Sequence, residues 1–216
     1  MIGALLVAGG AALFKGAFPE ASVIESPNKV VTSASGFEAR GLGDTPEEAA
    51  RAVLGKHGHA FGVGPRQRLA VAPTVPPGTT VRFQRRVDGL PVFDGDIIVG
   101  TKDDGTIIVV NTSDVPAKVT GKPRISRKAA IKSAEAGIPD LKTSDAPRAE
   151  RGWRAAGQSI RPVWRVDFVA VRPAADFRSY VDAETGKVLF RIDRRKTAAP
   201  AGLGAPKMER AADAPH

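Results

Sequence analysis

The chain has 216 residues, of which 42% are hydrophobic and 25% are charged. This composition is that of a folded globular protein and argues against global disorder, collagen-like repeats and membrane bundles. There is no cysteine, which excludes disulfides, thiol nucleophiles and thiolate zinc or iron–sulfur sites. The net charge of +9 lies in the second part, because residues 1–120 carry 12 basic and 12 acidic side chains whereas residues 121–216 carry 20 and 11.

The chain begins with an almost uncharged apolar run, Met1 to Phe14, which is followed by small residues at Gly16, Ala17 and Ala21. The length of this run predicts a signal peptide over residues 1–21, and with it a secreted or periplasmic location. No Lys or Arg precedes the run, so a short buried strand or helix is the alternative. No other stretch reaches transmembrane length, and no membrane span is expected in the mature chain.

After a lead-in segment over residues 22–43, residues 44–115 read as a first folded unit. Thr45 can cap a helix, Pro46 suits its first position and Glu48 completes a capping box. The helix is expected to end at Gly55 or Gly58. Strands follow at 81–87, 92–100 and 107–111, joined by turns at Asp88-Gly89 and Asp104-Gly105.

Residues 122–193 repeat this order. Ser126 opens a second helix, and strands are predicted at 163–171, 179–182 and 187–193. Three pairs of corresponding residues are each 81 positions apart in the sequence. They are the candidate helix caps Thr45 and Ser126, the strand aromatics Phe83 and Trp164, and the turn glycines Gly105 and Gly186. We therefore expect an α+β protein of two similar units, each a helix on a curved antiparallel sheet. The junction is expected near residues 115–122, and residues 194–216 read as a disordered tail.

The residues of common catalytic and cofactor sites do not occur in the required patterns. The histidines are His57, His59 and His216, and none lies in the His-Glu-x-x-His arrangement of zinc peptidases. Phosphate-binding glycine loops are also absent from the sequence. Trp164 alternates onto the buried face of its strand rather than a base-stacking surface. We therefore expect no catalytic residue, metal, cofactor or nucleic-acid partner.

Two segments resemble known families. Residues 81–111 contain Phe-Gln, then Gly-Leu-Pro-Val-Phe-Asp-Gly-Asp, a later Asp-Gly turn and a strand that ends in Asn. They resemble the fungalysin/thermolysin propeptide motif, known as FTP. Residues 124–193, with Trp-Arg-Val and then Tyr-Val-Asp-Ala-Glu-Thr-Gly-Lys-Val, are similar to a PepSY domain. Both families imply a cystatin-like fold for the two units.

This order of domains resembles the pro-regions of secreted thermolysin-like and fungalysin-like zinc peptidases. The resemblance implies a non-enzymatic propeptide that helps a metallopeptidase fold and inhibits it until cleavage activates the zymogen. The peptidase domain is absent from this sequence, so we expect the chain to be a detached pro-region, a truncated product or a free-standing relative that acts on a separate partner. The expected partner is a zinc metallopeptidase catalytic domain. The alternative is a free-standing basic protein that binds in the cell envelope or outside the cell, without a peptidase partner.

Partner contact is expected from polar side chains on the predicted strands or next to their ends. In the first unit these are Gln84, Arg85 and Arg86, although strand alternation puts Arg85 on the apolar face, where it could bury only its stem. In the second unit they are Arg165, Arg172 and Arg178, which we expect to meet an acidic surface.

Overall fold

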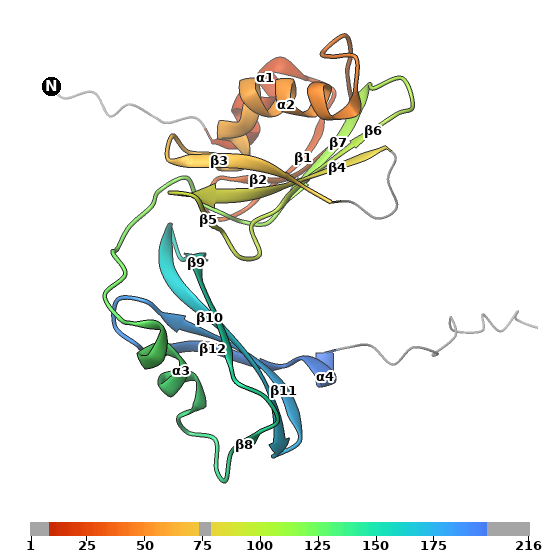
Figure 1. Cartoon of the computed structure of the whole chain (residues 1–216). Helices are drawn as coiled ribbons and strands as arrows, with labels where there is room; N and C mark the ends of the chain where they lie inside the picture. Colours follow the sequence, from red (N-terminus) through yellow and green to blue (C-terminus); the bar gives the residue numbers. More distant parts are fainter. Residues whose placement is uncertain (1–8, 74–78, 198–216) are drawn as a thin grey trace, which may run out of the picture.

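The computed structural model describes residues 9–73 and 79–197, which form two units placed end to end (Figure 1). The first contains α1 (Gly10–Ala17), β1 (Ser22–Glu25), β2 (Val31–Ala39), α2 (Pro46–His57), the 3-10 turn η1 (Gly58–Phe61), β3 (Gln67–Ala72), β4 (Thr80–Val87), β5 (Leu90–Pro91), β6 (Ile97–Thr101) and β7 (Ile107–Thr112). The second contains α3 (Arg127–Glu135), β8 (Lys142–Thr143), β9 (Arg148–Ala156), β10 (Ser159–Arg172), β11 (Ala175–Asp182), β12 (Val188–Asp193) and α4 (Arg194–Thr197). The predicted α+β class with two antiparallel sheets is confirmed.

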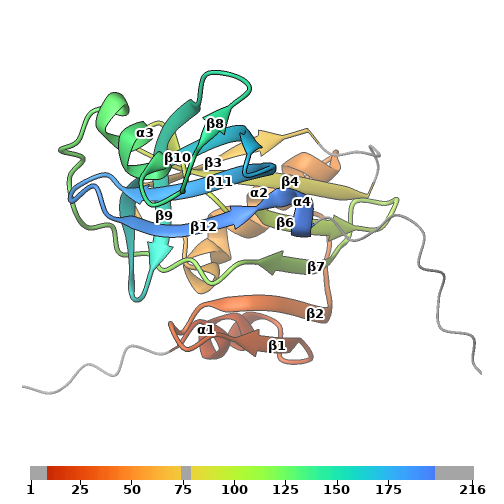
Figure 2. The ribbon, with the colours of Figure 1, turned by 90° about the horizontal axis from the view of Figure 1, so that it is seen from below.

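Each sheet contains a three-stranded meander that follows the helix of its unit, as the sequence repeat predicts. The strand order is β1-β2-β7-β6-β4-β3 in the first sheet and β12-β11-β10-β8 in the second, where β9 also pairs with β10. Thus β4-β6-β7 corresponds to β10-β11-β12, and Figure 2 shows the two sheets from below. Thr45 and Ser126 cap α2 and α3, and Gly105 and Gly186 both have a φ of 79° in the following turns. The offset of 81 residues therefore joins equivalent positions.

Helix α2 begins and packs as its sequence requires. Its capping box is complete, because Thr45 Oγ1 accepts from the amide of Glu48, whose carboxylate accepts from the amide of Thr45. The apolar side chains of its inner face, such as Val53, lie in one buried cluster with sheet residues such as Phe83. In the second unit, α3 places Ala130 and Ala134 against Val166, Phe168 and Val181 in the same way.

Helix α1 belongs to the core of the first unit. Phe14 is fully buried, and its ring lies 5.1 Å from that of Phe37, 5.2 Å from that of Phe61 and 5.8 Å from that of His57. This arrangement fits the buried helix that was the alternative to a signal peptide. The signal peptide itself stays a prediction, and its first eight residues lie outside the described part of the chain.

The structure differs from the predicted elements at several places. The segment 22–43, predicted as a lead-in, supplies β1 and β2, and β2 pairs with β7. The strand predicted over 92–100 is broken: residues 92–96 are not in a strand, and Asp94 has a left-handed φ of 59° that a continuous strand cannot accommodate. Residues 194–197, assigned to a tail, form α4, and residues 198–216 lie outside the described part.

Candidate functional site

The loop between β4 and β6, residues 88–96, includes the two-residue strand β5 and packs against the second unit. Val92 pairs in parallel with Trp153 of β9, and the amide of Phe93 donates to the Trp153 carbonyl at 2.8 Å. The Trp153 indole Nε1 donates in return to the Val87 carbonyl at 3.0 Å. Val87, Val92, Val115, Trp153 and Ile160 form one buried apolar cluster. The two sheets are thus held together by both backbone bonds and apolar packing.

Polar groups surround this contact where Phe93 meets the second sheet. The Arg165 guanidinium lies 4.6 Å from the centre of the Phe93 ring, and that of Arg154 lies 4.8 Å from the centre of the Tyr180 ring. Asp94 accepts from the Tyr180 hydroxyl at 3.3 Å and pairs with Arg154 at 3.4 Å. Burial, and then the nearby Asp94 carboxylate, raise the pKa of Tyr180.

Arg85 fixes the loop from inside the first unit. Its guanidinium is fully buried and donates to the carbonyls of Gly95 at 2.8 Å and Phe61 at 2.6 Å. It also donates to Gln67 Oε1 at 3.1 Å and Thr112 Oγ1 at 2.9 Å. Burial lowers its pKa to about 9, so it is still a cation at neutral pH. The expectation that Arg85 faces a partner is wrong, because its head group as well as its stem lies in the interior.

The other predicted contact residues of the first unit lie on the opposite face of β4. Gln84 and Arg86 are half-buried, and the Arg86 guanidinium donates to the Gly89 carbonyl at 3.0 Å. They therefore stand apart from the buried Arg85, and their contact with a partner stays a prediction.

In the second unit, two of the predicted arginines are neutralised within the chain. Asp167 accepts two bonds from Arg178, at 2.7 and 3.2 Å, and lies 3.6 Å from Arg165. Arg165 also binds Glu150 at 2.5 Å. Only Arg172, the third, is exposed and makes no ion pair within the described residues. The rest of the free basic charge of this unit lies elsewhere.

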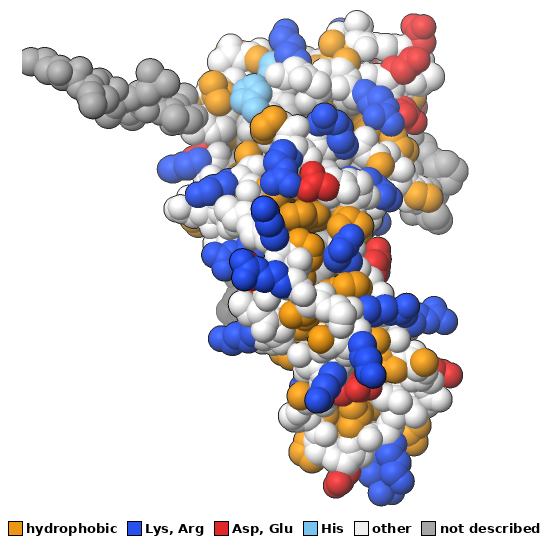
Figure 3. Space-filling model, turned by 60° about the vertical axis from the view of Figure 1, so that its left-hand side comes forward, with side chains coloured by type: hydrophobic (Ala, Val, Ile, Leu, Met, Phe, Trp, Pro, Cys, Tyr) orange, Lys and Arg blue, Asp and Glu red, His pale blue; other side chains and the backbone are white. Residues whose placement is uncertain are grey.

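That free charge includes side chains on and near α3. Lys122, Lys128, Lys132 and Lys187 are exposed. Figure 3 shows Lys and Arg spread over both units on one face of the molecule, with hydrophobic side chains among them and few acidic groups. Such a surface favours encounter with an acidic partner.

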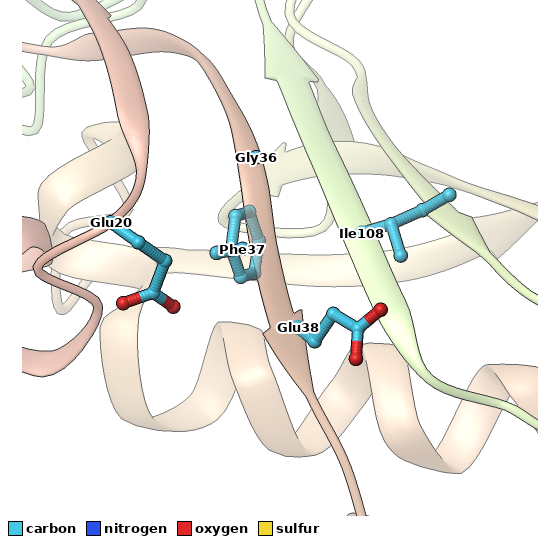
Figure 4. A pocket seen from close by; sticks show the side chains of 5 residues that line it. All are labelled: Glu20, Gly36, Phe37, Glu38 and Ile108. Carbon is cyan, nitrogen blue, oxygen red and sulfur yellow. The ribbon is translucent and has the colours of Figure 1, made fainter.

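No metal-binding site is found in the described residues. Within 9–73 and 79–197, no three His, Asp or Glu side chains gather in a way that could hold a metal ion, and no helix is long and apolar enough to cross a membrane. One hollow of about 500 Å³ is lined by Glu20, Gly36, Phe37, Glu38 and Ile108 (Figure 4). Glu38 is already bound by Lys102 and Arg40, whose hydrogen bonds lower its pKa.

The contacts at the junction coincide with a recognised motif. Residues 77–113 match the fungalysin/thermolysin propeptide motif. The matched stretch includes β4, the loop 88–96, β6 and β7, and therefore the residues Val87, Val92 and Phe93 that pair with Trp153. This match supports a role like that of a metallopeptidase pro-region.

The other comparisons add a distant structural neighbour. No curated protein matches the chain. Among solved structures, the Bacillus megaterium YpeB C-terminal domain is similar at 12% sequence identity and a TM-score of 0.33, over 85% of this chain and 95% of that one.

The junction itself was not foreseen from the sequence. Trp153, Asp94 and Tyr180 come from three distant parts of the chain, and none was singled out as a contact. One signal in the sequence indicates the contact. The segment with the two Asp-Gly turns also contains the apolar residues Leu90, Val92 and Phe93, and a surface loop rarely carries such side chains unless another part of the protein covers them.

Proposed function

We propose that this protein acts as a metallopeptidase pro-region, as a folding chaperone and inhibitor of a secreted zinc peptidase of the thermolysin-like or fungalysin-like kind. The match of residues 77–113 to the propeptide motif carries this proposal. We further propose that the chain is not itself an enzyme, that it works outside the cytoplasm, and that residues 122–193 form a PepSY-like domain.

The junction supports a pro-region that acts as one body. A chaperone of this kind must present a fixed surface on which the peptidase completes its fold, and a rigid surface loses less entropy on binding. The hydrogen bonds of Phe93 and Trp153 and the buried cluster around them hold the two units in one arrangement. The propeptide motif would then orient the second unit, in addition to the peptidase contacts predicted for Gln84 and Arg86.

Electrostatic attraction is expected to come from the lysines around α3. Arg165 and Arg178 are paired with Asp167, so they add little net charge to an encounter. Exposed Lys122, Lys128 and Lys132 are the better candidates, together with the predicted contacts Arg86 and Arg172. The predicted contact Gln84 is uncharged and would bind the partner through hydrogen bonds. Association should then slow as salt rises, because exposed charges are screened beyond about 8 Å at physiological ionic strength.

The proposal is tested with a mature secreted thermolysin-like peptidase from the same source. We expect the purified chain to inhibit cleavage of a chromogenic peptide, and to raise the recovered activity when the denatured peptidase is refolded with it. A Lys122, Lys128 and Lys132 triple substitution to Gln should lower the association rate, whereas Lys15→Gln with Lys56→Gln should not. If the chain neither inhibits the peptidase nor assists its refolding, the proposal fails. The result would then favour the alternative of a free-standing protein that binds in the cell envelope.

A further inference from the structure

The open edges of the two sheets differ in regularity. At the edge strand β1 the ladder to β2 has a register shift between Ile24 and Glu25, and the ladder that joins edge strand β12 shifts between Tyr180 and Val181. By contrast, β3 pairs with β4 over six consecutive residues without a shift, and β3 ends the strand order of its sheet. Bulges are one means by which edges are protected from further pairing. In the described residues, β3 is thus an edge strand without that protection.

The charges at this edge lack counterions. Arg68 of β3 lies directly opposite Arg86 of β4, an arrangement of like charges that destabilises a sheet. The Arg68 guanidinium donates to the carbonyls of Pro65 and Gln67, each at 2.9 Å, and Arg86 donates to that of Gly89. Neither forms an ion pair within the described residues, whereas nearby Asp88 is bound to Arg66 at 2.5 Å. A carboxylate from outside would relieve this repulsion.

The two faces of β3 differ in character. Because side chains alternate along a strand, Arg68 lies on the outer face of the sheet, while Leu69 and Val71 lie on the face that α2 covers. Leu69 packs against the core and Val71 remains 41% exposed. An added strand would therefore meet cations on one face and apolar side chains on the other.

We propose that edge strand β3 binds an extended segment of alternating acidic and apolar residues, which adds to the first sheet beside it. The backbone of the segment would pair with the free edge of β3, its carboxylates would reach Arg68 and Arg86, and its apolar side chains would cover Val71. Strand addition of this kind takes its affinity from main-chain hydrogen bonds and its specificity from alternate side chains. That the segment belongs to a peptidase rests on the proposed function, but binding at the edge does not.

The probe is a fluorescein-labelled heptapeptide of alternating Glu and Val with blocked ends, and its binding to the full chain is measured by fluorescence anisotropy. Hydrogen exchange locates the binding. We expect saturable binding with slower exchange of the amides of residues 67–72, and much weaker binding of the same peptide with Gln in place of Glu. Equal binding of the Gln peptide, or protection at β12 instead of β3, would overturn the proposal.

A matched pair of variants tests the charges. Arg68→Glu with Arg86→Glu keeps a like-charge pair across the ladder, so the fold bears the same repulsion while the attraction for the acidic peptide is reversed. We expect about tenfold weaker binding, the effect of losing two exposed ion pairs. Lys15→Glu with Lys56→Glu makes the same change of net charge on α1 and α2 and should leave the affinity unchanged. If both variants lower the affinity equally, the attraction is general and the edge site is refuted. No peptidase is used, so failure here is separate from failure of the proposed function.

Discussion

Replacing Arg85 by Met should be among the most destabilising single changes in the first unit. The substitution keeps an unbranched side chain in place and removes the donors of four hydrogen bonds, to Phe61, Gln67, Gly95 and Thr112. Each buried acceptor left without a donor costs about 1–3 kcal/mol. Removing the buried cation offsets part of that cost, because a charge in the interior is itself unfavourable. We expect a net loss of about 3–5 kcal/mol in the free energy of unfolding.

The measurement is urea unfolding followed by tryptophan fluorescence and by circular dichroism. Trp153 reports on the junction and Trp164 on the second core, so Trp153→Phe and Trp164→Phe backgrounds separate the two signals. The junction signal should be lost at lower urea in Arg85→Met. Arg82→Met is the control: this side chain is exposed on the same strand and pairs with Asp96, and its loss should cost less than about 1 kcal/mol. Equal stabilities of Arg85→Met and the unchanged protein would refute the reasoning.

Three further predictions concern the first core and the junction. Phe14→Ala should cost about 3–5 kcal/mol through the cavity it leaves, whereas exposed Leu13→Ala should cost far less in the same thermal scan. Burial, with smaller effects of Lys56 and His59, lowers the pKa of His57, so the unfolded state binds the proton more readily. Stability should therefore fall as the pH drops below about 6.5, and His57→Leu should lessen the fall; an unchanged pH profile would contradict this. A Cβ at position 152 would lie 2.5 Å from the Phe93 ring and 2.7 Å from the Pro91 carbonyl oxygen. Gly152→Ala should therefore separate the two units and shift the fluorescence of Trp153 to that of a more solvent-exposed side chain. An unchanged emission spectrum would count against the junction.

Local signals in the sequence predicted much of the fold. The caps at Thr45 and Ser126 and the turn at Asp88-Gly89, where both residues have positive φ, are specified by side chains within a few positions. The sequence does not predict strand β2, because this segment is rich in Ser and Ala and its pairing with β7 shifts register between Ser35 and Ala39. It is held by β7, a partner far along the chain that no local pattern announces.

The environment of Arg85 shows why site residues are harder to predict than elements. Alternation correctly placed Arg85 on the inner face of β4 with Phe83 and Val87. Whether a cation there turns outward or stays inside depends on the acceptors it meets, and these come from η1, β3 and the loop before β6. Likewise, Trp153 and Val87 are 66 residues apart, so their contact follows only from how the two units meet.

The pairing of β2 with β7 also sets an order in which the chain can fold. Ser33 of β2 lies opposite Asn111 of β7, whereas the pairs β10–β11 and β11–β12 join consecutive strands within residues 159–193. Contacts between distant residues form slowly because a long loop must close first. During synthesis, β2 lacks its second neighbour until β7 has left the ribosome. We therefore expect the second sheet to form quickly once its residues are available, and the first sheet to limit the rate at which the whole chain reaches its folded state.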